Sequence, residues 1–61
     1  MEGITVDKEV MGGKPCIRGL RVTVKTITDL VYCGRTKEEI LKAYPYITDQ
    51  DIDNCIKFDN N

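Results

Sequence analysis

Four cationic side chains gather in a short segment that contains no acidic residue: Lys14, Arg18, Arg21 and Lys25. Amino and guanidinium groups in such a segment bind phosphates, and an arginine fork also grips a carboxylate through two parallel hydrogen bonds. The alternative is that Arg18 and Arg21 pair with acidic helices or lie in water, with Gly19 serving only to make a turn. Because the positive charge is segregated, the pattern favours phosphate binding. These four residues are therefore the candidate nucleic-acid-binding residues.

Negative charge gathers in the second half of the chain, so the formal net charge of -1 hides two segments of opposite sign. A helix predicted over residues 49–59 has Lys57 as its one cation, against four aspartates: Asp49, Asp51, Asp53 and Asp59. DNA phosphates repel a helix of that charge. If the chain binds DNA, the basic segment and the start of the first helix are the better candidates for the contact.

Two residue types that often carry catalysis are missing, because the chain contains no His and no Ser. Neither a Ser–His nor a Cys–His pair can form, and no imidazole is present to act as a general base near neutral pH. Cys16, Cys33 and Cys55 form no C-x-x-C motif, and without His the usual zinc patterns fail. We expect no enzyme activity, no metal and no cofactor. We interpret the cysteines as reduced, mostly buried small hydrophobic residues of a cytosolic protein.

Length and hydropathy bound the class of protein. The chain begins with acidic residues where a signal peptide would be basic, and its longest apolar run covers only residues 30–33. We therefore expect a cytoplasmic protein without a membrane segment. A chain of 61 residues forms one domain at most, and a core of that size supplies only about 3–5 kcal/mol. We expect a homodimer with two-fold symmetry in which residues 4–24 contribute to the shared surface.

Hydrophobic patterns predict strands in the first third of the chain. Residues 4–6 form a short β-branched run, and residues 21–24 alternate between polar and apolar side chains as strands do. On such a strand Arg21 and Thr23 share the polar face, and the two valines face the helices. Glycines and a proline between the two runs exclude a helix there. The first third should therefore form a two-stranded ribbon with an irregular loop.

Two helices are predicted to follow the ribbon. The first spans residues 25–33, where apolar side chains recur at helical spacing, and Gly34 is placed to end it. The second begins with a capping box, in which Thr36 and Glu39 satisfy each other's backbone amides. Pro45 is placed to end this second helix.

A third helix begins with a looser version of the same box, formed by Thr48 and Asp51. Only Pro45, Tyr46 and Ile47 separate it from the second helix, which fits the helix-turn-helix plan. The predicted fold class is α+β, mostly α, in a single domain. Its two parts are a two-stranded ribbon with the basic loop (1–24) and a three-helix helix-turn-helix unit (25–58).

Three ordered motifs resemble those of one small prokaryotic family. The run GKPCIRGLRVTV at residues 13–24 resembles its signature G-x-P-x-I-x-G-T-R-I/V-x-V. The run GRTKEEI at residues 34–40 resembles its helix start, G-x-S/T-x-E-E-I. The run YPYITDQDI at residues 44–52 resembles its turn, Y-P-x-L-T-x-x-D-I. The family was long catalogued as domain of unknown function four-three-three and is now usually described as VapB-like antitoxins.

This resemblance implies a homeodomain-like helix-turn-helix fold, a homodimer and a role in a toxin–antitoxin module. The toxins of such modules are PIN-like ribonucleases encoded beside the antitoxin. Two departures bear on that role: Leu20 stands where the family usually has Thr, and the chain stops soon after the third helix, where longer members have a tail that could wrap a toxin.

Charge, fold and resemblance together predict a dimeric DNA-binding antitoxin that represses its own operator. The alternative is a protein–protein interaction module that neutralises a PIN-like ribonuclease without binding DNA. Salt separates these two functions, because DNA binding weakens steeply between about 50 and 200 mM salt. An apolar toxin interface should barely respond over the same range.

Overall fold

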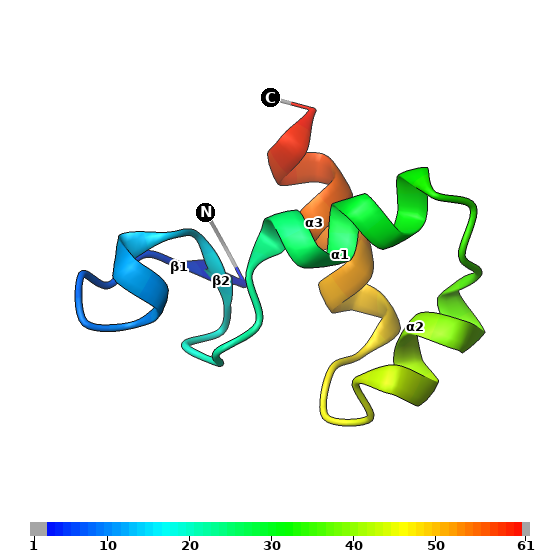
Figure 1. The fold of residues 1–61 in the computed structure, drawn as a ribbon, viewed down its shortest axis with the longest axis horizontal. Helices are drawn as coiled ribbons and strands as arrows, with labels where there is room; N and C mark the ends of the chain where they lie inside the picture. The colour runs from blue at the N-terminus through cyan, green and yellow to red at the C-terminus, as the bar shows by residue number, and fades with distance from the viewer. Residues whose placement is uncertain (1–2, 61) are drawn as a thin grey trace.

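A short β-ribbon followed by three helices makes up the fold, and the computed structural model describes residues 3–60 (Figure 1). The elements run in the order β1 (Ile4–Thr5), the 3-10 turn η1 (Met11–Gly13), β2 (Cys16–Ile17), α1 (Val24–Tyr32), α2 (Lys37–Ala43) and α3 (Asp49–Asp59). The predicted fold class, α+β and mostly α, is confirmed. Among the helices of residues 3–60, none combines the length and the apolar character that crossing a membrane requires.

The predicted two-stranded ribbon is present, but its second strand is Cys16–Ile17 and not residues 21–24. β1 and β2 pair antiparallel in this register: Ile4 with Ile17, and Thr5 with Cys16. The predicted strand at residues 21–24 lies along the other edge of β2, where the Ile17 N–H donates to the Val22 carbonyl at 3.0 Å. One isolated bridge joins Cys16 to Thr23. This single bridge is too little to make residues 21–24 a strand.

Thr23 is buried because it caps α1, so its expected place on a polar face beside Arg21 is wrong. Its Oγ1 accepts a hydrogen bond from the Thr26 N–H at 3.2 Å, and its side chain is 7% exposed. Val22 and Val24 on either side are each 4% exposed. Three consecutive buried side chains do not fit the alternation of a half-buried strand. Arg21 alone in this run faces solvent.

A tight turn after β2 puts two residues in the left-handed region. Arg18 has a φ of +42° and Gly19 a φ of +74°, and the Leu20 N–H donates to the Ile17 carbonyl at 2.7 Å. Positive φ at both central positions is typical of a type I′ turn. Glycine adopts this conformation without steric cost, whereas arginine adopts it rarely. The Gly19 N–H also donates to the Thr5 hydroxyl at 2.7 Å, which fastens the turn to β1.

Both predicted capping boxes form. In α2 the Thr36 Oγ1 accepts from the Glu39 N–H at 3.2 Å, and the Glu39 carboxylate accepts from the Thr36 N–H at 3.1 Å. In α3 the equivalent distances between Thr48 and Asp51 are 3.2 and 2.9 Å. Gly34, with a φ of +90°, follows α1 as predicted. Local chemistry therefore determines where these helices begin and end.

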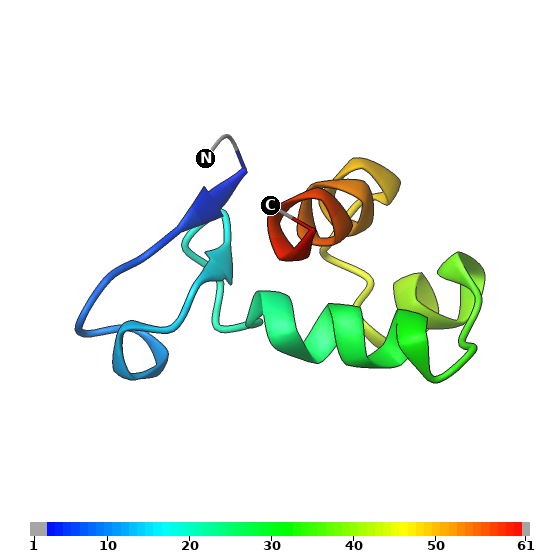
Figure 2. The same cartoon turned by 90° about the horizontal axis from the view of Figure 1, so that it is seen from above.

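One hydrophobic core joins the ribbon to all three helices. α1 and α3 pack against each other most extensively, and α2 lies against both (Figures 1 and 2). Six side chains are less than 2% exposed: Ile17, Ile27, Ile40, Ile52, Cys16 and Cys55. The segment between β1 and β2 instead projects away from the helices (Figure 2) and leaves Val6 66% and Met11 39% exposed.

Candidate functional site

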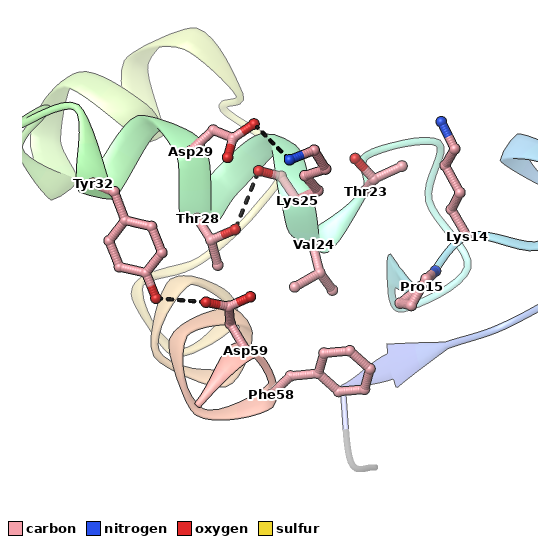
Figure 3. Close-up of a pocket in the computed structure, with 10 residues that line it drawn as sticks. All are labelled: Lys14, Pro15, Thr23, Val24, Lys25, Thr28, Asp29, Tyr32, Phe58 and Asp59. Carbon is pink, nitrogen blue, oxygen red and sulfur yellow. Dashed lines mark hydrogen bonds and ion pairs between the residues drawn. The ribbon is translucent and has the colours of Figure 1, made fainter. Parts of the chain in front are cut away.

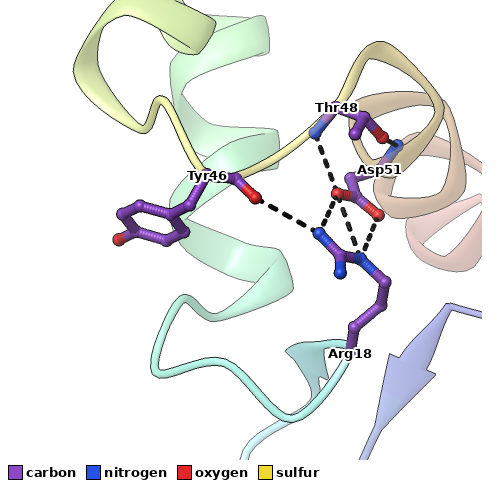
Figure 4. Close-up of polar contacts among 4 residues, drawn as sticks. All are labelled: Arg18, Tyr46, Thr48 and Asp51. Carbon is purple, nitrogen blue, oxygen red and sulfur yellow. Dashed lines mark hydrogen bonds and ion pairs between the residues drawn. The ribbon is translucent and has the colours of Figure 1, made fainter.

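Arg18, one of the four candidate cations, holds the basic turn against α3 (Figure 4). Its Nε donates to Oδ1 of Asp51 at 3.0 Å, and its Nη2 donates to Oδ2 of the same carboxylate at 2.9 Å. The same Nη2 reaches the carbonyl oxygen of Tyr46 at 3.3 Å, in the turn between α2 and α3. The guanidinium thus connects the turn after β2, the start of α3 and the turn between α2 and α3. This contact also occupies the fork with which an arginine would grip a phosphate.

Asp51 is a buried counter-ion for this arginine. The residue is 3% exposed, and its Oδ2 also accepts the Thr48 N–H of the capping box. The hydrogen bond from Arg18 is the largest influence on this carboxyl and, with the Thr48 bond, holds the pKa of Asp51 below its ordinary value in spite of burial. The same ion pair raises the pKa of Arg18. Both groups therefore carry full charge at neutral pH.

Arg21 lies three positions further along the chain, and its surroundings are different. The residue is exposed, and it makes no hydrogen bond or ion pair with any side chain of residues 3–60. Its neighbour Val22 is buried, which anchors the backbone while the guanidinium reaches water. An arginine held in this way keeps its donors available for a ligand.

Lys14 and Lys25 come together where residues 21–24 run beside β2. The Val24 N–H donates to the Pro15 carbonyl at 2.9 Å, so the residues next to each of them are neighbours in space. Lys25 is 82% exposed and lies 3.6 Å from Asp29, an arrangement that contributes little. Lys14 is exposed and forms no ion pair within the described part of the chain. Both ammonium groups are therefore accessible.

A groove of about 510 Å³ opens beside these two lysines, between α1, the end of α3 and the segment before β2 (Figure 3). Its lining is mostly apolar, and Pro15, Val24 and Phe58 are among the residues that form it. At its far end the Tyr32 hydroxyl donates to Oδ2 of Asp59 at 2.7 Å, and this hydrogen bond raises the pKa of Tyr32. The groove thus has a mostly apolar lining, with the Lys25–Asp29 pair, Lys14 and Asp59 as its charged residues.

The exposed side of α3 is acidic, and α2 neutralises only part of its charge. The Lys37 Nζ lies 2.7 Å from Oδ1 of Asp53 and 3.3 Å from Oδ1 of Asp49. Hydrogen bonds to these two carboxylates raise the pKa of Lys37. Lys37 and Lys57 are two cations against the three exposed aspartates of α3, so the helix keeps a net negative charge that repels phosphates. The structure therefore offers α3 no easy route into a DNA groove.

The cysteines offer no catalytic centre in the part of the chain that the structure describes. All three are free thiols, with Cys16 and Cys55 buried and Cys33 exposed. Burial raises the pKa of Cys55 to about 11, which leaves it protonated and a weak nucleophile near neutral pH. Over residues 3–60, no group of three His, Cys, Asp or Glu side chains is placed to hold a metal ion.

Two features of this surface have no local signal in the sequence. The sequence predicts Asp51 only as part of a helix start, yet its carboxylate binds an arginine 33 positions earlier in the chain. The groove joins side chains from two distant segments, residues 14–32 and residues 58–59. For Arg18, the structure bears out the alternative stated from the sequence, in which this arginine pairs with an acidic helix.

These observations define the class of the protein as a small α+β domain. Arg18, in the turn after β2, ties that turn to the helix-turn-helix pair through Asp51. The chain belongs to the family described as "Protein of unknown function (DUF433)", which it matches over residues 4–58. The crystal structure of a DUF433 member protein from Anabaena variabilis has the same fold, with a TM-score of 0.86 and 28% sequence identity. The match covers 95% of this chain and 57% of that one, so this chain spans little more than half of its length. No curated protein matches the chain.

Proposed function

We propose that this protein is a DNA-binding antitoxin and autoregulator of a prokaryotic toxin–antitoxin module, and that it acts as a homodimer. Its likeness to VapB-like antitoxins in three ordered motifs supports the module. The basic surface formed by Lys14, Arg21 and Lys25 supports the DNA contact. Arg18 is left out of this surface because its fork already holds Asp51.

The exposed guanidinium of Arg21 is the observation that carries this proposal. Its backbone is anchored by buried neighbours, and no carboxylate of residues 3–60 pairs with it. An arginine on an anchored backbone loses only side-chain freedom when it binds a phosphate, and its planar fork limits that loss for each hydrogen bond formed. Lys14 and Lys25, which the Val24–Pro15 hydrogen bond brings together, extend the positive charge around the start of α1.

The DNA contact therefore uses the ribbon side of the domain and not α3. Lys37 is already shared between Asp49 and Asp53, and the remaining negative charge of that face opposes phosphates. In this arrangement phosphate contacts supply the affinity, and base reading falls to residues near the basic turn.

Fluorescence anisotropy with a duplex from just upstream of the protein's own coding region tests this function. Affinity should fall steeply from about 50 to 200 mM salt. Arg21→Ala should weaken binding by about 1–3 kcal/mol and reduce the salt slope by about one. Lys42→Ala is the matched control, because Lys42 is an exposed cation in the last turn of α2 and should leave affinity nearly unchanged. Binding that ignores salt and tolerates Arg21→Ala would overturn the DNA contact.

Exposed apolar side chains favour a second candidate function, the neutralisation of a PIN-like ribonuclease without DNA. Val6 and Met11 lie on the segment that projects from the helices, where they are 66% and 39% exposed. Such side chains suit a partner protein. If this function is the correct one, a ribonuclease encoded beside the gene should bind with little salt dependence, and the upstream duplex should not bind.

A further inference from the structure

Tyr46, in the turn between α2 and α3, is an exposed aromatic residue whose hydroxyl is free. The residue is 55% exposed, and its hydroxyl makes no hydrogen bond with any group of residues 3–60. The other exposed tyrosine, Tyr32, donates its hydroxyl to Asp59 at 2.7 Å. Of these two exposed hydroxyls, that of Tyr46 is therefore the one open to a ligand.

Arg18 shows that Tyr46 lies beside the basic turn. The Arg18 Nη2 reaches the Tyr46 carbonyl at 3.3 Å, while the Arg18 backbone forms the turn after β2. Figure 4 shows this carbonyl directed at Arg18 and the Tyr46 ring on the other side of the backbone, away from α3. Arg21 follows the same turn and is exposed. The free hydroxyl and the free guanidinium therefore belong to two turns that contact each other.

Neighbouring residues hold Tyr46 in place without help from Arg18. The Ile47 N–H donates to the Tyr44 carbonyl at 3.1 Å, and the Ile47 side chain is 5% exposed. The rings of Tyr44 and Tyr46 meet edge to face, with centroids 6.3 Å apart and planes at 88°. A tyrosine side chain has only two rotatable angles, so its hydroxyl loses little freedom on binding.

The two acids that follow this turn in the chain are both engaged by cations. Asp49 lies 3.3 Å from the Lys37 Nζ, and Asp51 lies 2.9 Å from the Arg18 Nη2. Each cation reduces the repulsion that a phosphate beside Tyr46 would meet from these carboxylates. Tyrosine hydroxyls also belong to the donors that proteins use on DNA phosphates, together with arginine and lysine.

We propose that Tyr46 is a further phosphate contact, and that its hydroxyl donates a hydrogen bond to the backbone of the duplex that Arg21 binds. The proposal rests on the DNA-binding function proposed above, and it extends the basic surface to the turn of the helix-turn-helix pair. The two contacts differ in charge. Arg21 neutralises a phosphate and releases counterions, whereas an uncharged hydroxyl releases none.

Tyr46→Phe tests this contact, because it removes one oxygen atom and keeps the ring that packs against Tyr44. Affinity for the upstream duplex, measured by fluorescence anisotropy, should fall about three- to tenfold, the range that one hydrogen bond supplies. The dependence of affinity on salt should keep the slope of the unchanged protein, whereas Arg21→Ala lowers that slope by about one. The melting temperature of Tyr46→Phe should not change, because the residue is exposed.

Tyr32→Phe is the matched control. It removes the same atom from the other exposed tyrosine, whose hydroxyl is bound to Asp59, and it should leave DNA affinity unaltered.

A series of duplexes, each with one phosphate replaced by an uncharged methylphosphonate, locates the contact. At one position the replacement should weaken binding of the unchanged protein and have much less effect on Tyr46→Phe, which has already lost the donor. A different position should show the same behaviour with Arg21→Ala. Tyr46→Phe that binds as tightly as the unchanged protein, a reduced salt slope in this variant, or replacements that cost both proteins equally at every position would each overturn the proposal.

Failure of this contact can be told apart from failure of the DNA function. If Arg21→Ala weakens binding and Tyr46→Phe does not, Tyr46 is no contact and the DNA function stands. If the unchanged protein does not bind the upstream duplex at all, both proposals are wrong.

Discussion

Two arginines in one short segment have opposite surroundings. Arg18 is bound through two nitrogens to a buried carboxylate, whereas Arg21 has no partner in residues 3–60. Residue type, charge and neighbouring glycine do not distinguish them. The difference arises because the turn after β2 points Arg18 at the start of α3 (Figure 4), whereas Arg21 lies past that turn and is exposed. A cluster of cations in a sequence is therefore not one site, since each member has to be assigned by what it contacts.

The largest expected effect comes from removing the carboxylate of Asp51, which pairs with Arg18 and not with Arg21. Asp51→Ala should lower the free energy of unfolding by about 1–3 kcal/mol, because the variant loses half of the capping box and the ion pair with the half-exposed Arg18. Urea denaturation measures this change. Asp51→Asn is the matched control. Its amide oxygen can still accept the Thr48 N–H, so it should lose less than Asp51→Ala. Equal losses would mean that the charge of Asp51 does not matter.

Low pH should also weaken the ion pair between Arg18 and Asp51. The folded-state pKa of Asp51 lies below its ordinary value, so its contribution is present above about pH 4 and is lost as the pH falls through the folded-state pKa. Unfolding free energies between pH 7 and about pH 2 should therefore decline for the unchanged protein. The decline should be shallower in Asp51→Asn. An equally steep fall of the unfolding free energy at low pH in both proteins would show that other carboxylates cause the pH dependence.

A smaller effect is expected at the capping box of α2, which has the same motif without a buried partner. Glu39 accepts from the Thr36 N–H and lies 3.4 Å from Arg35, all at the exposed surface. Hydrogen bonding from the Thr36 backbone is the largest cause that lowers the pKa of Glu39. Glu39→Ala should reduce the melting temperature by clearly less than Asp51→Ala does. Calorimetry that ranks the two variants the other way would contradict the role given to Arg18.

The parts of the fold that the sequence predicts well are those whose cause is local. Thr36 with Glu39, Thr48 with Asp51, and Gly34 each act within one helical turn, so their types and spacing predict helix ends.

The parts that were missed depend on contacts across the chain. Residues 21–24 alternate as a strand does, but β2 takes β1 as its main partner, and Thr23 turns inward to cap α1. Arg18 and Asp51 are 33 positions apart, and no periodicity connects them. The four candidate cations share one segment of the chain, but the sequence does not show that Arg18 is paired with an acid while Arg21 is exposed.

The most direct test measures stability and DNA affinity together in Arg18→Ala and Arg21→Ala. Arg21→Ala should change the free energy of unfolding by less than about 1 kcal/mol and weaken binding to the upstream duplex by about 1–3 kcal/mol. Arg18→Ala should lower the melting temperature clearly and leave the affinity of its folded fraction nearly unchanged. If Arg21→Ala unfolds the protein while its folded fraction binds normally, Arg21 is structural, and the assignment of the two arginines is wrong.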